Sequence, residues 1–302
     1  MLNLMQLSPI LIPALIMLLP VFIIVLGLTY LRKSKRVKRR NPISDELLRG
    51  PGESLRKQID DVSLDLITYV SFASTYPLFV YAIYLNYVQT SEGHKFTNIT
   101  LGYFLLIGIA GIVYIGYKLC KFIKLKRNLS LGYDAELAVG QELNAMTREG
   151  YWIFHDFPAE NYNIDHVLVG PAGVYAIETK GRAKPIKSDG KPEYKVIYDG
   201  KKLSFPSWTE SEPLEQAIRQ ASSLQIWLSS AVGETILVKP VLMLPGWFID
   251  RTSASGILVL NGKNANSLLG KVSGNCLSEV LLKRIVHQLD QRCRTVKPVN
   301  IS

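Results

Sequence analysis

The chain has 302 residues and a formal net charge of +10, and its length allows one globular domain plus a further segment. The charge is uneven, because residues 1–127 contain 16 Lys and Arg against 7 Asp and Glu, whereas residues 128–302 contain 19 against 18. The net charge is therefore not by itself evidence for a nucleic-acid-binding domain. Three cysteines that are far apart and form no Cys-x-x-Cys pair favour a reducing compartment and argue against structural zinc.

Three apolar runs in the first half of the chain indicate membrane helices. Residues 8–31, 66–88 and 101–117 carry no charged side chain, and each approaches or exceeds the roughly 18 to 20 residues that cross a hydrocarbon core. A cleaved signal peptide is the alternative for the first run, but no positive charge precedes it. The third run is short and Gly-rich and could instead be a buried core helix. We expect three transmembrane helices, arranged as helix 1 in residues 1–31, a basic cytoplasmic linker in residues 32–62 and a helical hairpin in residues 63–119.

The basic residues predict the orientation of these helices. Lys and Arg are concentrated in residues 32–40 and 118–127, and loops rich in these residues stay in the cytoplasm. We therefore expect a multi-pass protein of the inner (cytoplasmic) membrane, with its N-terminus outside and its C-terminal domain in the cytoplasm. The same clusters would lie on anionic lipid headgroups, which makes the bilayer an expected partner.

The remaining residues, 128–297, are predicted to form an α/β domain with one central mixed sheet flanked by helices. Apolar spacing predicts helices at residues 132–149, 210–230 and 277–289. Residues 151–157, 236–244 and 256–260 are strand candidates. Two hairpins are expected, one in residues 162–180 around Pro171-Ala172-Gly173 and one in residues 194–205 around Asp199-Gly200.

The first hairpin carries the candidate site. Side chains alternate along a strand, so Glu178 and Lys180 share a face, and Asp165 can lie across from Glu178. Two close carboxylates repel each other unless a divalent cation lies between them, and hard oxygen ligands suit Mg²⁺ or Mn²⁺. The competing interpretation is an ordinary exposed hairpin with solvated charges. His166 alternates to the opposite face from Asp165 and is expected to pack or to form hydrogen bonds.

Three sequence blocks resemble the nuclease-related domain (NERD) family, a branch of the PD-(D/E)XK restriction-endonuclease-like superfamily. They are Gly132-Tyr-Asp-Ala-Glu136, Asn163-Ile-Asp165-His166-Val-Leu-Val-Gly170-Pro171-Ala-Gly173-Val-Tyr-Ala-Ile-Glu178-Thr-Lys180 and Pro213-Leu-Glu-Gln216-Ala. The resemblance is clearest from residue 131 to residue 228. It implies a restriction-endonuclease-like central mixed sheet, here preceded by three transmembrane helices.

The resemblance also implies roles for five residues. Asp165 and Glu178 would bind the metal, with Glu136 as a third carboxylate, and Lys180 would orient the attacking water or stabilise the charge that develops on the phosphate. Gln216 would contact substrate or water. Two of these residues have simpler interpretations, because Gln216 could be a solvated residue of an exposed helix face and Glu136 could favour a helix dipole.

Residues 180–202 form a locally basic stretch that could bind phosphates. It holds 8 Lys and Arg against 3 Asp and Glu, and we expect Arg182, Lys184 and Lys187 to contact nucleic acid. Tyr194, Tyr198, Phe205 and Trp208 lie among these residues and could stack on bases. The alternatives are lysines that protect a sheet edge and aromatic side chains that pack in a core.

The leading hypothesis is a membrane-anchored, cytoplasm-facing nuclease that uses Mg²⁺ or Mn²⁺ to hydrolyse DNA, although the sequence does not distinguish DNA from RNA. A fragment of residues 128–302 is expected to degrade DNA. The alternative is an inactive nuclease fold that binds nucleic acid or a protein partner at the membrane. A transport or sensor function of the helices is disfavoured, because the apolar runs contain no charged residue.

Overall fold

A computed structural model describes residues 45–90, 98–185, 193–263 and 277–297, together with residues 23, 26, 27 and 30. The chain divides into two compact units. One is helical and comprises residues 1–45, 61–125 and 298–302, and the other is globular and comprises residues 46–60 and 126–297.

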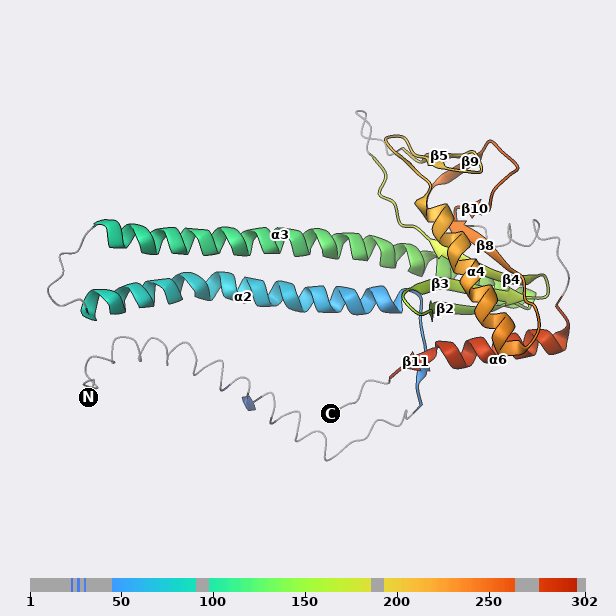
Figure 1. Cartoon of the computed structure of the whole chain (residues 1–302), viewed down its shortest axis with the longest axis horizontal. Helices are drawn as coiled ribbons and strands as arrows, with labels where there is room; N and C mark the ends of the chain where they lie inside the picture. The colour runs from blue at the N-terminus through green and yellow to red at the C-terminus, as the bar shows by residue number, and fades with distance from the viewer. Residues whose placement is uncertain are drawn as a thin grey trace. The chain divides into compact units, whose positions relative to one another are not determined.

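Two long helices, α2 (Glu53–Thr90) and α3 (Asn98–Leu143), provide most of the described part of the helical unit, and the start of α2 and the end of α3 belong to the globular unit (Figure 1). Both are long and apolar enough to cross a membrane, and they contain the second and third predicted apolar runs. They contact each other through Tyr76, whose hydroxyl group donates a hydrogen bond to the carbonyl of Ile107 at 2.7 Å. Gly111 lies against the ring of Tyr76, where a Cβ atom would not fit. The first predicted helix, residues 1–31, lies outside the described residues except at four positions.

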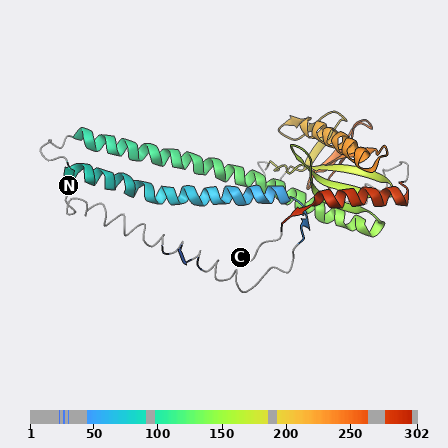
Figure 2. The same ribbon diagram turned by 60° about the horizontal axis from the view of Figure 1, so that its bottom comes forward.

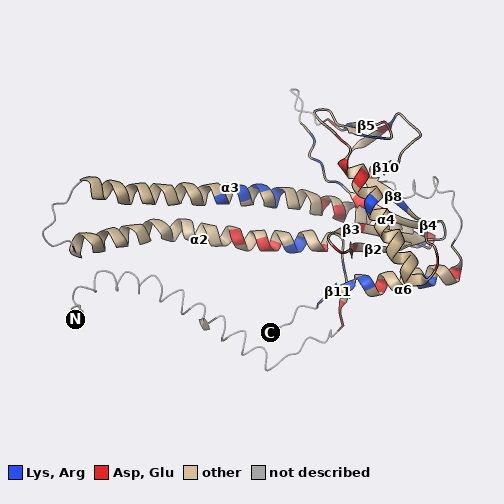
Figure 3. Ribbon diagram, viewed as in Figure 1, with Lys and Arg blue, Asp and Glu red and all other residues tan. Residues whose placement is uncertain are grey.

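Helix α3 corrects the predicted boundary between membrane helix and domain. The sequence predicts a membrane hairpin that ends at residue 119 and a separate helix at 132–149, but the structure has one helix to Leu143, followed by the 3-10 helix η1 (Asn144–Glu149). Residues 118–131 contain neither Gly nor Pro and consist largely of good helix formers, so nothing interrupts the helix. The blue band on α3 in Figure 3 marks the basic cluster within this stretch.

The globular unit contains a five-stranded mixed sheet in the order β10-β8-β4-β3-β2. Strands β2, β3 and β4 are antiparallel neighbours, whereas β4, β8 and β10 are parallel. The bounds are β2 (Trp152–Pro158), β3 (Asn163–Gly170), β4 (Gly173–Thr179), β8 (Val238–Met243) and β10 (Leu258–Leu260). The predicted hairpin of β3 and β4 and the three other predicted strands are confirmed.

The predicted central mixed sheet is present, but the described residues form two further sheets that the sequence did not predict. The second predicted hairpin forms, but its strands belong to a four-stranded sheet in the order β7-β6-β5-β9. Its strands are β5 (Lys195–Tyr198), β6 (Leu203–Ser204), β7 (Thr209–Glu210) and β9 (Phe248–Arg251). The unpredicted strand β9 pairs in parallel with β5 at one edge of this second sheet. The short strands β1 (Leu47–Leu48) and β11 (Arg294–Val296) form a third, antiparallel sheet.

Helices cover both faces of the main sheet. Helices α4 (Glu212–Val232) and α6 (Glu279–Cys293), orange and red in Figures 1 and 2, pack their apolar residues on one face. Ala221, Leu224 and Leu228 of α4 contact the same core as Val167 and Ala176 of the strands. The end of α3 and η1 cover the other face with Val139, Leu143 and Met146. Because burial of such side chains contributes about 1.5–3 kcal/mol each, these two cores hold the hairpin in place.

Strands β2 and β3 both change face at a pair of aspartates. Phe154 and Phe157 belong to the same core, although residues three apart in a regular strand point to opposite faces. Asp156 lies between them with a positive φ of 50°. The register pairs His155 with His166 and Phe157 with Ile164, so Asp156 lies opposite Asp165. This irregularity turns both aspartates out of the regular alternation.

Candidate active site

Glu178 and Lys180 meet at the C-terminal end of β4. The Nζ atom of Lys180 lies 2.6 Å from Oε1 of Glu178 and donates a hydrogen bond of 2.8 Å to Oε1 of Gln216 on α4. The backbone amide of Lys180 still donates to the carbonyl of Met243 on β8 at 2.9 Å, which anchors this residue. The contact confirms that Glu178 and Lys180 share a face, and it brings in Gln216 as the third predicted residue.

Asp165 lies at the same end of the hairpin. The register pairs His166 with Ile177, which places Asp165 opposite Glu178 as the sequence predicts. Its Oδ2 atom accepts a hydrogen bond of 2.6 Å from the backbone amide of Thr179. Asp165 is half-buried, and loss of solvent around its carboxyl group, together with the charges of Glu178 and Glu136, raises the pKa of Asp165 well above its usual range.

Glu136 approaches from the part of α3 that belongs to the globular unit. It is 7% exposed, and burial, followed by the charges of Asp156 and Glu178, raises its pKa from 4.5 to about 8. Lys180 and the backbone amide of Gly52 act in the opposite direction. Since Glu136 also raises the pKa of Asp165, the three predicted carboxylates lie within electrostatic range of one another.

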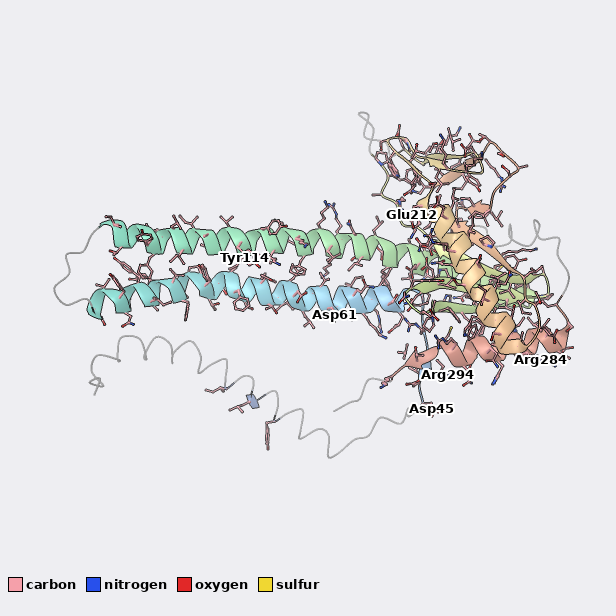
Figure 4. The ribbon with its side chains drawn as sticks, in the orientation of Figure 1. Asp45, Asp61, Tyr114, Glu212, Arg284 and Arg294 are labelled. Atoms are coloured by element: carbon pink, nitrogen blue, oxygen red, sulfur yellow. The ribbon has the colours of Figure 1, made fainter. Side chains whose placement is uncertain are left out.

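Burial and the neighbouring ammonium group of Lys180 act on the pKa of Glu178 in opposite directions. Glu178 is 2% exposed, and burial raises its pKa, while the ammonium group of Lys180 and the amide group of Gln220 lower it. Glu212, labelled in Figure 4 at the beginning of α4, adds a further charge that raises the pKa. The Oε2 atom of Glu178 is buried and has no hydrogen-bond partner among the described residues, so this oxygen can still accept a cation or a donor.

The chemistry of these carboxylates fits a divalent cation. Glu178 raises the pKa of both Glu136 and Asp165, and one buried oxygen of Glu178 has no hydrogen-bond partner among the described residues. All the candidate ligand atoms are hard oxygen atoms of the kind that Mg²⁺ binds. Within the ranges that the structure describes, no three His, Cys, Asp or Glu side chains already lie together as a metal-binding group. The ammonium group of Lys180 instead supplies the positive charge beside Glu178. Cation binding would therefore require these side chains to move closer together.

The predicted nucleic-acid contacts have different surroundings. Arg182 forms a two-pronged ion pair with Glu210, with Nε and Nη2 at 2.9 and 3.0 Å from the carboxylate oxygens. The Nζ atom of Lys184 lies 6.0 Å from the centre of the Trp247 ring, and Lys187 lies outside the described residues. The guanidinium of Arg182 is thus already engaged in the protein.

Most of the predicted stacking aromatics pack in a core. Tyr198 and Phe205 are buried, and the rings of Phe205 and Trp208 stack with centroids 4.4 Å apart beside Trp247. Tyr194 is the exception, because it is 61% exposed. The core-packing alternative therefore describes three of the four residues.

Two residues near the site escaped the sequence reasoning. Gln220, whose amide group acts on Glu178, lies one helical turn after Gln216, so helical spacing could have revealed it. Asp156 carried no recognisable signal, because its position depends on the positive φ in β2.

The His155–His166 pair, with Nδ1 atoms 2.8 Å apart, confirms the hydrogen-bonding role expected of His166. Burial lowers the pKa of both rings, to about 4 in His155, so the pair is neutral at pH 7.

The cavity found beside α4 does not contain the acids. It has a volume of about 470 Å³ and is lined by the residues of the β2–β3 turn, by Trp227 and its neighbours on α4, and by Arg292. Asp165 and Glu178 are not among its lining residues. The candidate site is therefore defined by its side-chain contacts rather than by a deep pocket.

Comparison with known proteins gives a family match for part of the chain. Residues 131–245 match the family described as NERD, the nuclease-related domain, and this stretch contains Glu136, Asp165, Glu178, Lys180 and Gln216. No curated protein and no solved structure matches the chain. The match supports the nuclease-related domain that the sequence blocks indicate.

Proposed function

We propose that the globular unit, through its nuclease-related stretch, is an endonuclease that hydrolyses phosphodiester bonds of DNA with Mg²⁺ or Mn²⁺. The observation that carries the proposal is the contact of Lys180 with both Glu178 and Gln216, beside Asp165, at the end of one hairpin. A metal-dependent phosphodiesterase needs carboxylates and a cationic hydrogen-bond donor at one place. The match to the nuclease-related domain supports a role of these residues in phosphodiester hydrolysis.

Each side chain has a role that follows from its contacts. Asp165, Glu178 and Glu136 would hold the cation, which would polarise the scissile phosphate and generate a hydroxide nucleophile from water when bound. Lys180 is held by two oxygen acceptors, so its remaining N–H group can be directed at a phosphate oxygen, where charge develops in the transition state. Gln216 accepts a hydrogen bond from the ammonium group of Lys180 and thereby fixes the direction of its remaining N–H group.

The membrane location belongs to the same proposal. Helices α2 and α3 have the length and composition of membrane spans, and the Lys and Arg residues at positions 118–127 favour the cytoplasm for the adjoining globular unit. The enzyme would then act on DNA close to anionic lipid headgroups.

Because Arg182 is bound to Glu210, Lys184 is the better candidate for a phosphate contact.

The test is DNA cleavage by the full-length chain in detergent, with Mg²⁺, Mn²⁺ or EDTA. We expect cleavage with either metal and a loss of at least about 100-fold in Asp165→Asn and Glu178→Gln, which remove charge with little change of shape. Glu215→Gln is the matched control, because Glu215 is an exposed acid on α4 whose side chain is 62% exposed. Cleavage by Asp165→Asn at the rate of the control would remove the proposal.

A second function, a binding module without catalysis, is favoured by one observation. The described residues contain no ready-made group of three metal-binding side chains, and Lys180 already neutralises Glu178. Titration calorimetry distinguishes the two functions. A scaffold should bind DNA without Mn²⁺ and should show no Mn²⁺ binding that is lost in Glu178→Gln.

A further inference from the structure

Residues 49–54, here called segment 49–54, lie in the globular unit although they come before both long apolar stretches. Strand β1, directly before the segment, pairs with β11, and the amide of Arg49 donates to the carbonyl of Cys293 at 3.0 Å. The family match begins only at residue 131. The segment is therefore a part of the folded unit that the nuclease-related stretch does not include.

One end of the segment holds the carboxylate of Asp156. Nε of Arg49 donates to Oδ2 of Asp156 at 2.9 Å, and the guanidinium also forms an ion pair with the same oxygen. Ser54 adds two hydrogen bonds, from its amide to Oδ2 at 2.9 Å and from its hydroxyl group to Oδ1 at 2.7 Å. Asp156 is 1% exposed. A carboxylate this deeply buried depends on such partners, so segment 49–54 holds it in place.

The middle of the segment reaches Glu136. The backbone amide of Gly52 hydrogen-bonds to Glu136 and favours its ionised form. Gly52 has a φ of +66°, and a Cβ atom on it would lie 2.7 Å from Cδ2 of Tyr133 and 3.6 Å from Oε2 of Glu136. Only glycine fits this approach to α3 without strain.

Both contacts reach residues of the candidate site or next to it. Glu136 is one of the three carboxylates, and Asp156 lies opposite Asp165 where β2 and β3 change face. Asp156 also acts electrostatically on Glu136. The charge of Arg49 beside Asp156 partly balances the negative charge that this fourth acid adds to the site.

We propose that segment 49–54 is a positioning element of the nuclease site, in which Gly52 orients Glu136 while Arg49 and Ser54 hold Asp156 beside Asp165. This inference rests on the proposed nuclease function. Residues that orient metal ligands without touching the metal alter affinity or activity by about 10- to 100-fold. A fragment of residues 128–302 lacks the segment, so it is expected to bind metal and cleave DNA more weakly than the full chain.

The test compares two alanine substitutions in the same loop of the full-length chain. Gly52→Ala forces a side chain against Tyr133, whereas Gly50→Ala meets no atom within 4 Å. Mn²⁺ binding in the absence of DNA is followed by electron paramagnetic resonance, and kcat and KM for DNA cleavage are measured at saturating Mg²⁺. We expect Gly52→Ala to weaken Mn²⁺ binding and to lower kcat by about tenfold or more, while KM changes less than about twofold. The control Gly50→Ala should match the wild type in all three quantities.

The outcomes separate this inference from the proposed function. Unchanged Mn²⁺ affinity and kcat in a folded Gly52→Ala protein would overturn the positioning role and leave the nuclease proposal standing. A wild type that binds Mn²⁺ without cleaving DNA would refute the nuclease proposal, while weaker binding by Gly52→Ala would still support the positioning role. A wild type without either property would overturn both.

A second variant covers the case in which Gly52→Ala does not fold. Ser54→Ala leaves the backbone of Gly52 unchanged and removes the 2.7 Å hydrogen bond to Oδ1 of Asp156. A tenfold loss of Mn²⁺ affinity in the folded Ser54→Ala protein supports the inference. Wild-type affinity in that variant contradicts it.

Discussion

Replacement of Glu136 by Gln should stabilise the metal-free protein while it abolishes cation binding. Glu136 is 7% exposed, and burial together with Asp156 and Glu178 raises its pKa from 4.5 to about 8. Below pH 4.5 the group is protonated in both the folded and the unfolded chain. As the pH rises towards 8, the unfolded chain loses the proton first, and the folded state becomes less stable.

The size of the effect follows from the two pKa values. A rise from 4.5 to about 8 corresponds to at most about 5 kcal/mol of stability lost by pH 9, and to about 3 kcal/mol at pH 7. Glu136→Gln does not titrate and avoids this loss. Since about 1 kcal/mol shifts the melting temperature of a unit of this size by roughly 2–4 °C, the variant should melt on the order of 10 °C higher than the wild type at pH 9.

Tryptophan fluorescence provides the assay, because all four Trp residues of the chain lie between positions 152 and 247 and so report only on the globular unit. Melting is followed in EDTA from pH 4 to pH 9, for the wild type, Glu136→Gln and Glu142→Gln. Glu142 is an exposed acid on the same helix and serves as the control. A difference between Glu136→Gln and wild type that stays constant from pH 4 to pH 9 would refute the reasoning. With Mn²⁺ present, the wild type should gain melting temperature and Glu136→Gln should not.

Three further predictions concern the ammonium group, the Arg182 ion pair and the membrane orientation. Lys180→Met should lower the rate of DNA cleavage by about 10²- to 10³-fold, because it removes the ammonium group that Glu178 and Gln216 hold. Initial rates within about threefold of the wild type would contradict this prediction. Arg182→Ala should lower the unfolding free energy by about 1 kcal/mol, because it removes the ion pair with Glu210. If DNA binding by this variant, measured by fluorescence anisotropy, depends less on salt than DNA binding by the wild type, Arg182 contacts phosphate instead. A reporter enzyme active only in the cytoplasm should be active when fused after residue 302, and an inactive reporter would reverse the predicted orientation.

The main hairpin and the contacts of its polar residues could be predicted because they follow from local rules. Alternation with a period of two determines that Glu178 and Lys180 share a face, and the short turn determines that Asp165 lies opposite Glu178. Helical spacing located α4 to within two residues at each end, so Gln216 was placed on a helix. These relations depend only on residues close together in the sequence.

The remaining features depend on residues far apart in the sequence. Arg49 and Asp156 are 107 positions apart, and no pattern in either neighbourhood indicates the other. The parallel pairing of β5 with β9 likewise joins distant segments, so the second hairpin was assigned to the wrong sheet. The positive φ of Asp156 is imposed by the packing of both phenylalanines on one core, which is a tertiary effect.

The pairing of β1 with β11 has a consequence for how the protein is made. Leu47 pairs with Val296, so the first strand is synthesised long before its partner. Domains whose contacts are this distant in sequence fold slowly, and an N-terminal strand without its partner exposes an unpaired edge. Segment 49–54 therefore reaches Glu136 and Asp156 only after both apolar helices have been synthesised, and the globular unit is completed only after β11 has been made.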